Sequence, residues 1–394
     1  MNKHPRDLTR PGVAFALSPQ DFLALNPNTG TAPIFNSSLD ADITLGIYRR
    51  HPVLIRDGAA DGNPWGLGFG TLFHMANDSD LFHRADDLSA AGTTFDGWAW
   101  THGDRRWLPL YEAKMLAFYD HRFSTYKDLR AGYEGTALPR VTDEEHDDAA
   151  VEPLGRYWVA ETDVDKALAG RWDRAWLFGW RDIARSTDAR TMMPSVLPRS
   201  AVGDKFLLTF PAEPEYATLL QAVWSSLVFD YVARQKLSGT GMKYFIVKQI
   251  ACPTPATFDA VPAWTDQPLR DVVLPRVLEL TYTSNRIAPY ARDLGDDGPP
   301  FRWLPERRVV LRAELDAIML HVYGLARDEA EHVLDSFPVI RRYEERDLGE
   351  FRTKRLVLES YDAMAAAAAS GVPWRGALDP APGHGTRHGE GGTR

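Results

Sequence analysis

The sequence predicts an α+β fold in which a β-rich central part precedes a mostly helical C-terminal part. Short apolar runs separated by turn residues fill the region 154–213, as expected for strands. From about residue 262 the apolar residues favour a series of helices. The 394 residues are enough for two or three domains, and 44% hydrophobic with 25% charged residues is typical of a globular protein.

The first part is predicted as an N-terminal extension over 1–25 and a mixed α/β segment over 26–141. A helix is expected over 37–50, because it begins with serines and early acids and places apolar residues at helical spacing before Pro52. Residues 52–56 favour a strand and 62–70 a loop. The aromatic-rich stretch 98–118 is expected to include a further strand.

The acidic, proline-ended stretch "TDEEHDDAAVEP" (142–153) is predicted to be a linker. A β-rich domain is expected over 154–261, with strands in "RYWVA", "AWLFGWRDI", "MMPSVLP" and "FLLTF" and one long helix over 214–237. The helical domain then covers 262–370. Its predicted helices are 270–289, 305–323, 327–335 and 351–369. The Gly/Pro-rich tail 371–394 is expected to be disordered.

Composition bounds the class of protein. The net charge is −9, which argues against a uniformly basic nucleic-acid-binding surface. Three mildly basic regions nevertheless stand out, 101–130, 171–205 and 230–250, and they fit either a basic groove or solvated surfaces. A single cysteine, Cys252, excludes an internal disulfide and a cysteine-based metal site. With no membrane-span-sized apolar run and no secretory signal pattern, we expect a cytoplasmic protein.

Two segments have the composition of a polyanion-binding surface. In "GWRDIARSTDARTMMPSVLPRS" (179–200), Arg181, Arg185 and Arg190 alternate with hydroxyl residues such as Thr187, and arginine forks suit guanine edges or phosphates. A surface β-turn with local Asp–Arg pairs is the alternative. In 233–250 a basic helix end meets a Gly-rich turn that presents Lys243 and Tyr244, which suits a phosphate or a simple helix cap.

The stretch "LYEAKMLAFYDHRFSTY" (110–126) mixes aromatic rings with ionisable groups. Glu112 and Lys114, with an upstream acid such as Asp96, form the minimal pattern of a Mg²⁺-dependent nuclease, in which two carboxylates hold the metal. The same pair can be purely structural. The histidines of the chain have no metal-ligand spacing, so no metal site is predicted.

Methyltransferase signatures are incomplete. "GPPF" (298–301) has Gly298 where amino-directed DNA methyltransferases need a side-chain acceptor for the target amino group. "GLGFG" (66–70) is not placed at a strand-to-helix turn, so no catalytic residue and no cofactor-binding residue is assigned.

Several strings nevertheless resemble one family in order, among them "NPNTGTAPIFNSSLDADITLGIYRRHPVLI", "WLPLYEAKMLAFYDHRFSTY", "RDIARSTDARTMMPSVLPR" and "LVFDYVARQKLSGTGMKYFIVKQI". Together they are similar to the C-terminal half of large adenine-specific DNA methyltransferases of restriction-modification and DISARM-like phage-defence systems. The resemblance covers roughly residues 25–368 and implies a target-recognition domain of the TaqI specificity class.

The resemblance implies a DNA-binding protein that recognises the target for adenine-N6 methylation. It places the DNA-facing candidates at Arg181, Arg185, Thr187, Arg190, Lys243 and Tyr244, with Lys114, His121 and Arg122 facing the DNA backbone. The family's catalytic motifs lie upstream of the matching region. We therefore expect S-adenosylmethionine on a separate methyltransferase subunit, with a split gene, a truncated inactive remnant and a wrongly assigned start codon as the open explanations.

Overall fold

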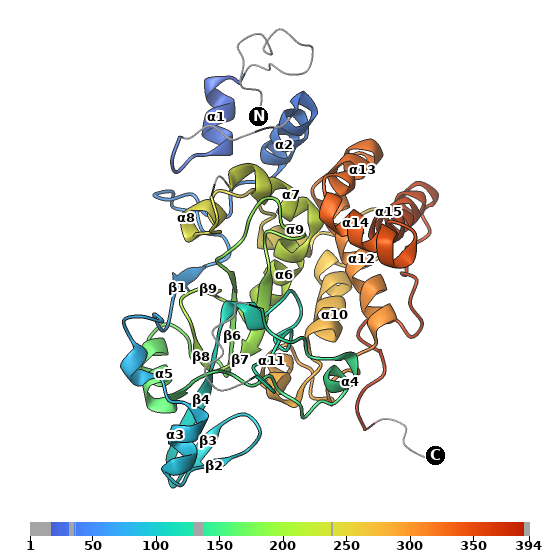
Figure 1. The fold of residues 1–394 in the computed structure, drawn as a ribbon. Coiled ribbons are helices and arrows are strands. Elements are labelled where there is room, and N and C mark those ends of the chain that lie inside the picture. The colour runs from blue at the N-terminus through green and yellow to red at the C-terminus, as the bar shows by residue number, and fades with distance from the viewer. Residues whose placement is uncertain (1–16, 31–34, 36, 130–136, 238, 390–394) are drawn as a thin grey trace.

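The computed structural model describes residues 17–30, 35, 37–129, 137–237 and 239–389. Figure 1 shows the strands on one side of the molecule and the C-terminal helices on the other, with helices α6 and α10 between them. The strands are β1 (Gly68–Gly70), β2 (Thr94–Phe95), β3 (Trp100–His102), β4 (Arg105–Tyr111), β5 (Trp158–Ala160), β6 (Trp176–Arg181), β7 (Pro194–Pro198), β8 (Ala201–Val202) and β9 (Phe206–Phe210). The predicted α+β class is confirmed.

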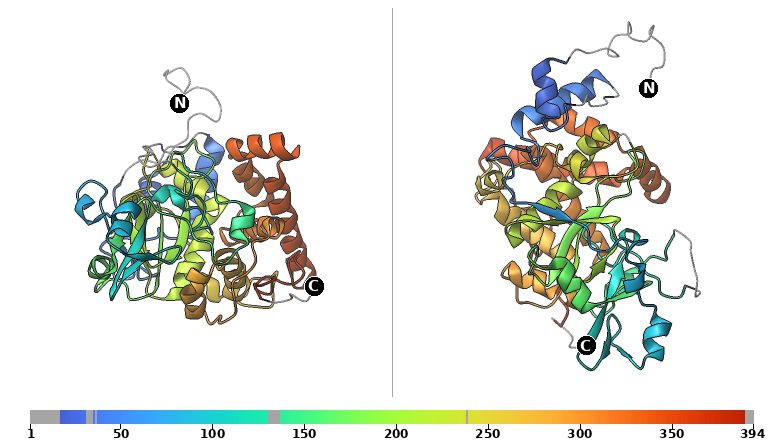
Figure 2. Two further views of the ribbon diagram at one scale, coloured as in Figure 1. Left: turned by 60° about the horizontal axis from the view of Figure 1, so that its bottom comes forward. Right: turned by 90° about the vertical axis from the view of Figure 1, so that its left-hand side faces the viewer.

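The helices complete the element order. Before the C-terminal part they are α1 (Pro19–Leu25), α2 (Ser38–Arg50), α3 (Ala85–Ala90), α4 (Asp143–His146), α5 (Glu161–Leu168), α6 (Pro214–Ser225), α7 (Leu227–Lys236), α8 (Tyr244–Val247) and α9 (Pro255–Asp259). After them come α10 (Leu269–Thr281), α11 (Ala288–Asp293), α12 (Pro305–Val322), α13 (Arg327–Asp335), α14 (Pro338–Leu348) and α15 (Arg352–Ser370). Short 3₁₀ turns lie at Ser79–Leu81, Ala113–Met115 and Asn285–Ile287. In Figure 1 and the right view of Figure 2, α1 and α2 lie at one end and α3 with β2 and β3 at the other.

The central sheet has the antiparallel order β1-β9-β6-β7 and is buried on both faces. Along β6, Trp176, Phe178 and Trp180 belong to the large core beneath the helices, whereas Leu177 joins a second core on the other face. Alternate residues of a strand point to opposite faces, so burial of both faces requires an unbroken apolar run. This explains why "AWLFGW" and "FLLTF" lack alternating polar residues.

The second sheet, β2-β3-β4-β5 with β8 parallel to β4, packs on that second core. It confirms the strand expected within 98–118 and the one expected in "RYWVA". The stretch 52–56 is not a strand of any length, because it makes a single bridge between Val53 and Ala251. The expected loop 62–70 ends in β1, which pairs with β9.

The helix predicted over 214–237 is interrupted at Ser226. Ser226 is extended (φ −72°, ψ 150°) and caps α7 by accepting a hydrogen bond from the backbone N–H of Phe229 at 3.2 Å. The carboxylate of Asp316 accepts the N–H of Leu227 at 2.7 Å. A serine cap and a distant carboxylate thus satisfy the amides that a continuous helix would have bonded internally.

The helical C-terminal part is confirmed, with six helices, α10 to α15, in its described residues where four were predicted. Helices α12, α13 and α15 match the expected ranges within a few residues, and the helix expected over 270–289 divides into α10 and a turn leading to α11. Helix α14 was missed because its sequence "PVIRRYEERDL" is polar and none of its side chains is buried. Among the described residues no helix is long and apolar enough to cross a membrane.

The predicted linker 142–153 is wrong. Residues 143–146 form α4, and the side chain of Glu152 is buried against His121, with 3.0 Å between the carboxylate and the ring nitrogen. The predicted division into separate domains is not reflected in the packing either, since one large core contains residues from Leu25 to Ala367. The acidic composition suggested a solvated segment, but its carboxylates and carbonyls have partners inside the fold.

The prediction of a disordered tail is also wrong for the residues described, 371–389. The backbone N–H of Trp374 donates to the carbonyl of Trp264 at 2.8 Å, and their rings meet edge to face. Further along, the N–H of Gly383 donates to Glu279 at 2.9 Å, and Arg387 forms an ion pair with Asp296 at 2.5 Å. Tail and helices therefore exchange specific polar contacts that a composition bias does not reveal.

Trp374→Ala is expected to loosen this tail. The ring packs on Trp264 and lies under the guanidinium of Arg276, 4.9 Å from ring centroid to Cζ. Losing a half-buried aromatic should lower the free energy of unfolding by about 1–2 kcal/mol. Amide hydrogen exchange over residues 376–388 should speed up. Val372→Ala is the control, because Val372 is 67% exposed. Equal amide exchange rates over residues 376–388 in the two variants would contradict the packing of the tail on the helices.

Candidate functional site

The β6–β7 hairpin carries the loop 182–193, which is fixed from below by a buried carboxylate of α7. Asp230 accepts hydrogen bonds from Arg190 Nε at 2.8 Å and from the backbone N–H of Thr191 at 2.9 Å. Arg234 bonds Asp230 at 2.9 Å and also donates to the carbonyl of Asp188 at 2.8 Å. Burial alone would raise the pKa of Asp230, but the two arginines hold it below its ordinary value.

The outer face of this loop is polar and cationic. Ile183, Arg185 and Thr187 are exposed, and the guanidinium of Arg185 bonds to no other described residue. The Gly-rich turn beside it is joined to the loop, because the N–H of Met242 donates to the carbonyl of Asp182 at 2.7 Å. Lys243, half exposed, forms an ion pair with Asp182 at 2.5 Å. The two basic segments singled out in the sequence therefore lie side by side.

The inner face of the loop lines a cavity of about 1040 Å³. Its wall includes residues of 114–124 and 137–146, residues 188–193 of the loop, and side chains of α12, α14 and α15. The loop thus lies between the outer surface that carries Arg185 and a pocket that is partly open to solvent. Residues from both halves of the chain contribute to this space, so it exists only when strands and C-terminal helices pack together.

The carboxylates that line the cavity are all engaged by other groups. The acceptors and their donors are Asp120 with the N–H of Arg122 (2.9 Å), Asp143 with Trp303 Nε1 (2.9 Å), Asp188 with the N–H of Arg185 (3.0 Å), Glu306 with Arg352 (3.0 Å), Asp316 with the N–H of Leu227 (2.7 Å) and Glu344 with the N–H of Thr353 (2.8 Å). Each of these six carboxylates therefore already has at least one hydrogen-bond donor within the fold.

Four arginines of the wall, Arg140, Arg181, Arg308 and Arg312, form no ion pair with any described residue, and of these Arg308 donates to the carbonyls of Leu280 and Tyr119. Arg140 lies over the ring of Phe123, with 3.4 Å between its Cζ and the centroid, and Arg181 reaches only the sulfur of Met193 at 3.6 Å. The Nε of Arg181 is buried without a hydrogen-bond partner. A buried donor without an acceptor is costly, so the Nε of Arg181 is available to an anionic ligand.

The arginines also repel one another. Burial, followed by the charge of Arg140, lowers the pKa of Arg181. Burial lowers the pKa of Arg312 as well; the charge of Asp316 opposes this shift, while Arg190 and Arg352 add to it. Arg308, which donates to the carbonyl of Leu280 at 2.7 Å, has its pKa lowered by burial to about 9. An anion in the cavity would relieve this repulsion.

Asp316 lies on α12 among these cations. Burial raises its pKa from the ordinary 3.8 to about 6, although Arg190 and Arg312 oppose the shift. The folded protein therefore binds more protons than the unfolded chain between pH 4 and pH 6, so this group lowers stability as pH rises through that window.

Asp316→Asn is expected to remove this pH dependence. The amide oxygen can still accept the N–H of Leu227, but the buried charge is gone. Relative to wild type, the variant should gain about 1–3 kcal/mol at pH 7.5 and nothing near pH 4. Urea denaturation of both proteins at the two pH values measures the difference. If the free energies of unfolding of the two proteins differed by the same amount at every pH from 4 to 7.5, ionised Asp316 would not destabilise the fold.

The sequence-predicted site residues divide into three groups. Lys114, Arg181 and Arg190 line the cavity, although Arg190 also serves the loop through Asp230. Arg185, Thr187 and Lys243 lie on the outer face. The prediction of Tyr244 as a DNA-facing group is not supported, since its hydroxyl donates to the carbonyl of Gly70 at 2.5 Å and its ring packs on Trp180.

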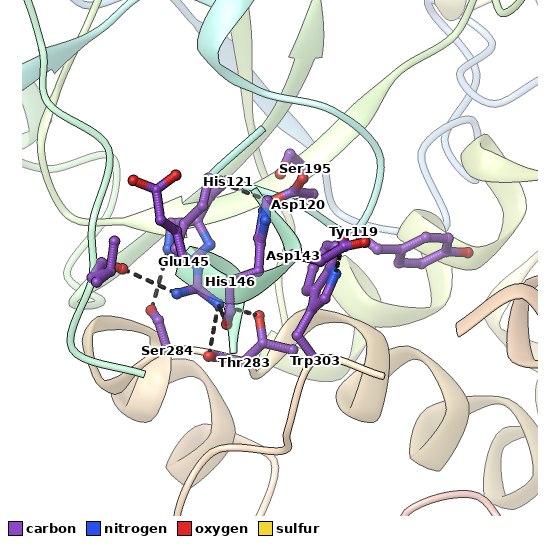
Figure 3. A network of polar contacts seen from close by, with 12 residues as sticks. Tyr119, Asp120, His121, Asp143, Glu145, His146, Ser195, Thr283, Ser284 and Trp303 are labelled. Carbon is purple, nitrogen blue, oxygen red and sulfur yellow. Dashed lines mark hydrogen bonds and ion pairs between the residues drawn. The ribbon is translucent and has the colours of Figure 1, made fainter. Parts of the chain in front are cut away.

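The placement of His121 and Arg122 at a DNA-facing surface is wrong, because both are buried. Figure 3 shows the polar network around His121 and Ser284. Arg122 is fully buried and donates to the carbonyls of His146, Asp148, Val151 and Thr283. His121 contacts Glu152 and lies 3.3 Å from the hydroxyl of Ser284. These groups join the segment 142–153 to the end of α10, which is a structural role.

The nuclease pattern is only partly assembled. Lys114 lies 3.4 Å from Glu112, whose carboxylate also accepts the hydroxyl of Tyr126 at 2.5 Å. Asp96 pairs elsewhere, with Arg286 at 3.0 Å. Within the described part of the chain no group of three His, Cys, Asp or Glu side chains is arranged to hold a metal ion. The Glu112–Lys114 pair fits its structural alternative.

The residues present do not fit an S-adenosylmethionine site or a methyltransferase catalytic loop. Phe301 of "GPPF" is fully buried under Arg387, whose Cζ lies 3.7 Å from the ring centroid, so the ring cannot stack on a base. A Cβ added at Gly298 would lie 2.8 Å from the same guanidinium. "GLGFG" ends in β1, whose residues pair with β9 and precede no helix of a nucleotide-binding turn.

Sequence reasoning missed Arg140, Arg308, Arg312 and Arg352 as cavity residues. A usable signal existed on α12, where Arg308, Arg312 and Asp316 recur at four-residue spacing and therefore share one face of the helix. No such signal marks Arg140, which comes from an irregular segment.

The chain matches no protein-family model, and no significantly similar protein was found among curated proteins or solved structures.

Proposed function

We propose that this protein is a DNA-binding target-recognition module of an adenine-N6 DNA methyltransferase system, of the restriction-modification or phage-defence kind. The resemblance of its sequence strings to that family motivates the proposal. The observation that carries it is the loop 182–193, which presents the unpaired guanidinium of Arg185 outward, beside the half-exposed Lys243, and lines an arginine-rich cavity on its inner side.

The outer face of the loop has the chemistry for duplex contact. Arg185 offers a bidentate donor fork and Thr187 a hydroxyl, the groups that read base edges and bind phosphate oxygens. Lys243 on the neighbouring turn adds a cation suited to the phosphate backbone. Asp230 and Arg234 hold the loop in one conformation, so these contacts require little ordering on binding.

Methyl transfer belongs to a catalytic subunit that carries S-adenosylmethionine. The cofactor would supply the methyl group, while the residues of this chain bind and orient the duplex. By holding the DNA in register, they would keep the target adenine at the position from which the catalytic subunit extrudes it. Phosphate contacts provide affinity, and the side chains of the loop provide the sequence preference.

Binding to duplex DNA tests this proposal. Arg185→Ala and Lys243→Ala should each weaken binding to a target duplex about five- to tenfold, since each removes one charge-assisted contact. Fluorescence anisotropy at fixed salt gives the dissociation constants. Arg355→Ala is the matched control, because Arg355 lies on α15, half exposed and paired with Glu350 at 2.8 Å. Binding that is absent, or equally weak in all three variants, would refute the proposal and favour an inactive remnant.

A further inference from the structure

The cavity under the loop is too small for a double helix. Its volume of about 1040 Å³ is at the upper end of the range for small-molecule sites. A double helix is far larger, because its major groove alone is about 12 Å wide and accommodates an α-helix. A ligand that enters this space must therefore be a single nucleotide or a short unpaired stretch.

The charge of the wall selects a phosphate. The six lining carboxylates already accept hydrogen bonds, whereas Arg140, Arg181 and Arg312 have no carboxylate partner among the described residues. Planar guanidinium groups match two phosphate oxygens at once. Binding a phosphate would satisfy the buried Nε of Arg181 and compensate for the burial that chiefly lowers the pKa of Arg181 and Arg312.

The remaining wall suits a base. Phe118 is half buried and contributes its ring beside Val309, Leu227 and Leu356, which gives an apolar surface adjacent to the arginines. The Cζ atom of Arg312 lies 5.8 Å from the centroid of the Phe118 ring. One nucleotide can therefore contact both the cationic and the aromatic part of the wall. Unpaired bases are commonly held against such apolar and aromatic surfaces.

We infer that the cavity binds one unpaired, phosphate-bearing nucleotide, held by Arg140, Arg181 and Arg312. The DNA then has two sites, which rests on the proposed function. A duplex lies on the outer face of the loop, and a nucleotide displaced from that duplex enters the cavity. A free nucleoside monophosphate has the same chemistry and is the other source of the ligand.

The experiment compares four probes: a fully paired duplex, the same duplex with one unpaired nucleotide, dAMP and inorganic phosphate. Competition anisotropy is measured for wild type, for the cavity variants Arg312→Met and Arg140→Ala, and for the outer-face variant Arg185→Ala. Arg140 is exposed, so its variant should fold normally even if Arg312→Met lowers the melting temperature.

Wild type should prefer the duplex with the unpaired nucleotide about tenfold, and both cavity variants should lose this preference while keeping their affinity for the paired duplex. Arg185→Ala should weaken both duplexes equally. If the cavity variants lost the same amount of affinity for both duplexes, the inference would be overturned. It would also be overturned if inorganic phosphate competed as strongly as dAMP. If no duplex binds but dAMP binds in an Arg140-dependent way, the cavity site stands and the proposed DNA-recognition function falls.

Discussion

Arg122→Met is expected to lower the free energy of unfolding by about 3–5 kcal/mol. The guanidinium is fully buried and donates to the carbonyls of His146 (2.6 Å), Asp148 (2.9 Å), Val151 (3.0 Å) and Thr283 (2.9 Å). Methionine fills a similar volume but donates no hydrogen bond, so four buried carbonyls lose a partner. It also removes the positive charge that faces Glu152 and Asp120.

Chemical denaturation followed by tryptophan fluorescence measures this change. Arg122→Lys should recover only part of the loss, because one ammonium cannot reach all the carbonyls of the guanidinium fork. Arg56→Met is the control, since Arg56 is exposed, and it should change stability by less than about 0.5 kcal/mol. A loss below about 1 kcal/mol for Arg122→Met would mean that the network in Figure 3 contributes little.

Asp230→Ala is the second large effect, with an expected loss of about 3–5 kcal/mol. The carboxylate is fully buried and accepts from Arg190, from Arg234 and from the N–H of Thr191. Removing it leaves Arg190 as an uncompensated buried charge and frees the loop 182–193. Amide exchange within the loop should speed up, and duplex binding should weaken even though Asp230 touches no ligand.

The pH dependence separates this effect from simple loss of packing. Because the folded-state pKa of Asp230 lies below its ordinary value, its stabilisation is present above about pH 4 and is lost as pH falls through the folded-state pKa. The difference in stability between wild type and Asp230→Ala should therefore shrink in acid. Glu359→Ala, at an exposed ion pair with Arg355, should change stability by under about 1 kcal/mol at every pH. A difference that stays constant down to pH 2 would contradict the ionic role of Asp230.

Much of the fold could be predicted because burial leaves a periodic trace in the sequence. The unbroken apolar runs of β6 and β9 and the spacing in α6 and α12 identified those elements. Polar segments gave no such trace. The segment 142–153 and the tail 371–389 are ordered by contacts to distant groups, such as Arg122 and Glu279, and composition carries no record of those contacts.

The candidate site could be predicted only in part, for a related reason. Arginine-rich local motifs pointed to Arg181, Arg185 and Lys243, which do lie around one loop. The resemblance, through the stretch 110–126, also selected Arg122, whose partners are backbone carbonyls, a kind of acceptor that every residue supplies. Arg140 and Arg312 join the site only through packing of segments about 170 residues apart, which local patterns cannot reveal.

The central claim is that this acidic chain binds duplex DNA through phosphate contacts at the outer face of the loop 182–193 and the neighbouring Lys243. The most direct measurement is the salt dependence of duplex affinity. With Arg185 and Lys243 engaged, about two phosphates are neutralised, so log K should fall with log salt at a slope of roughly −2. A slope near zero, or no duplex binding even at low salt, would contradict the account.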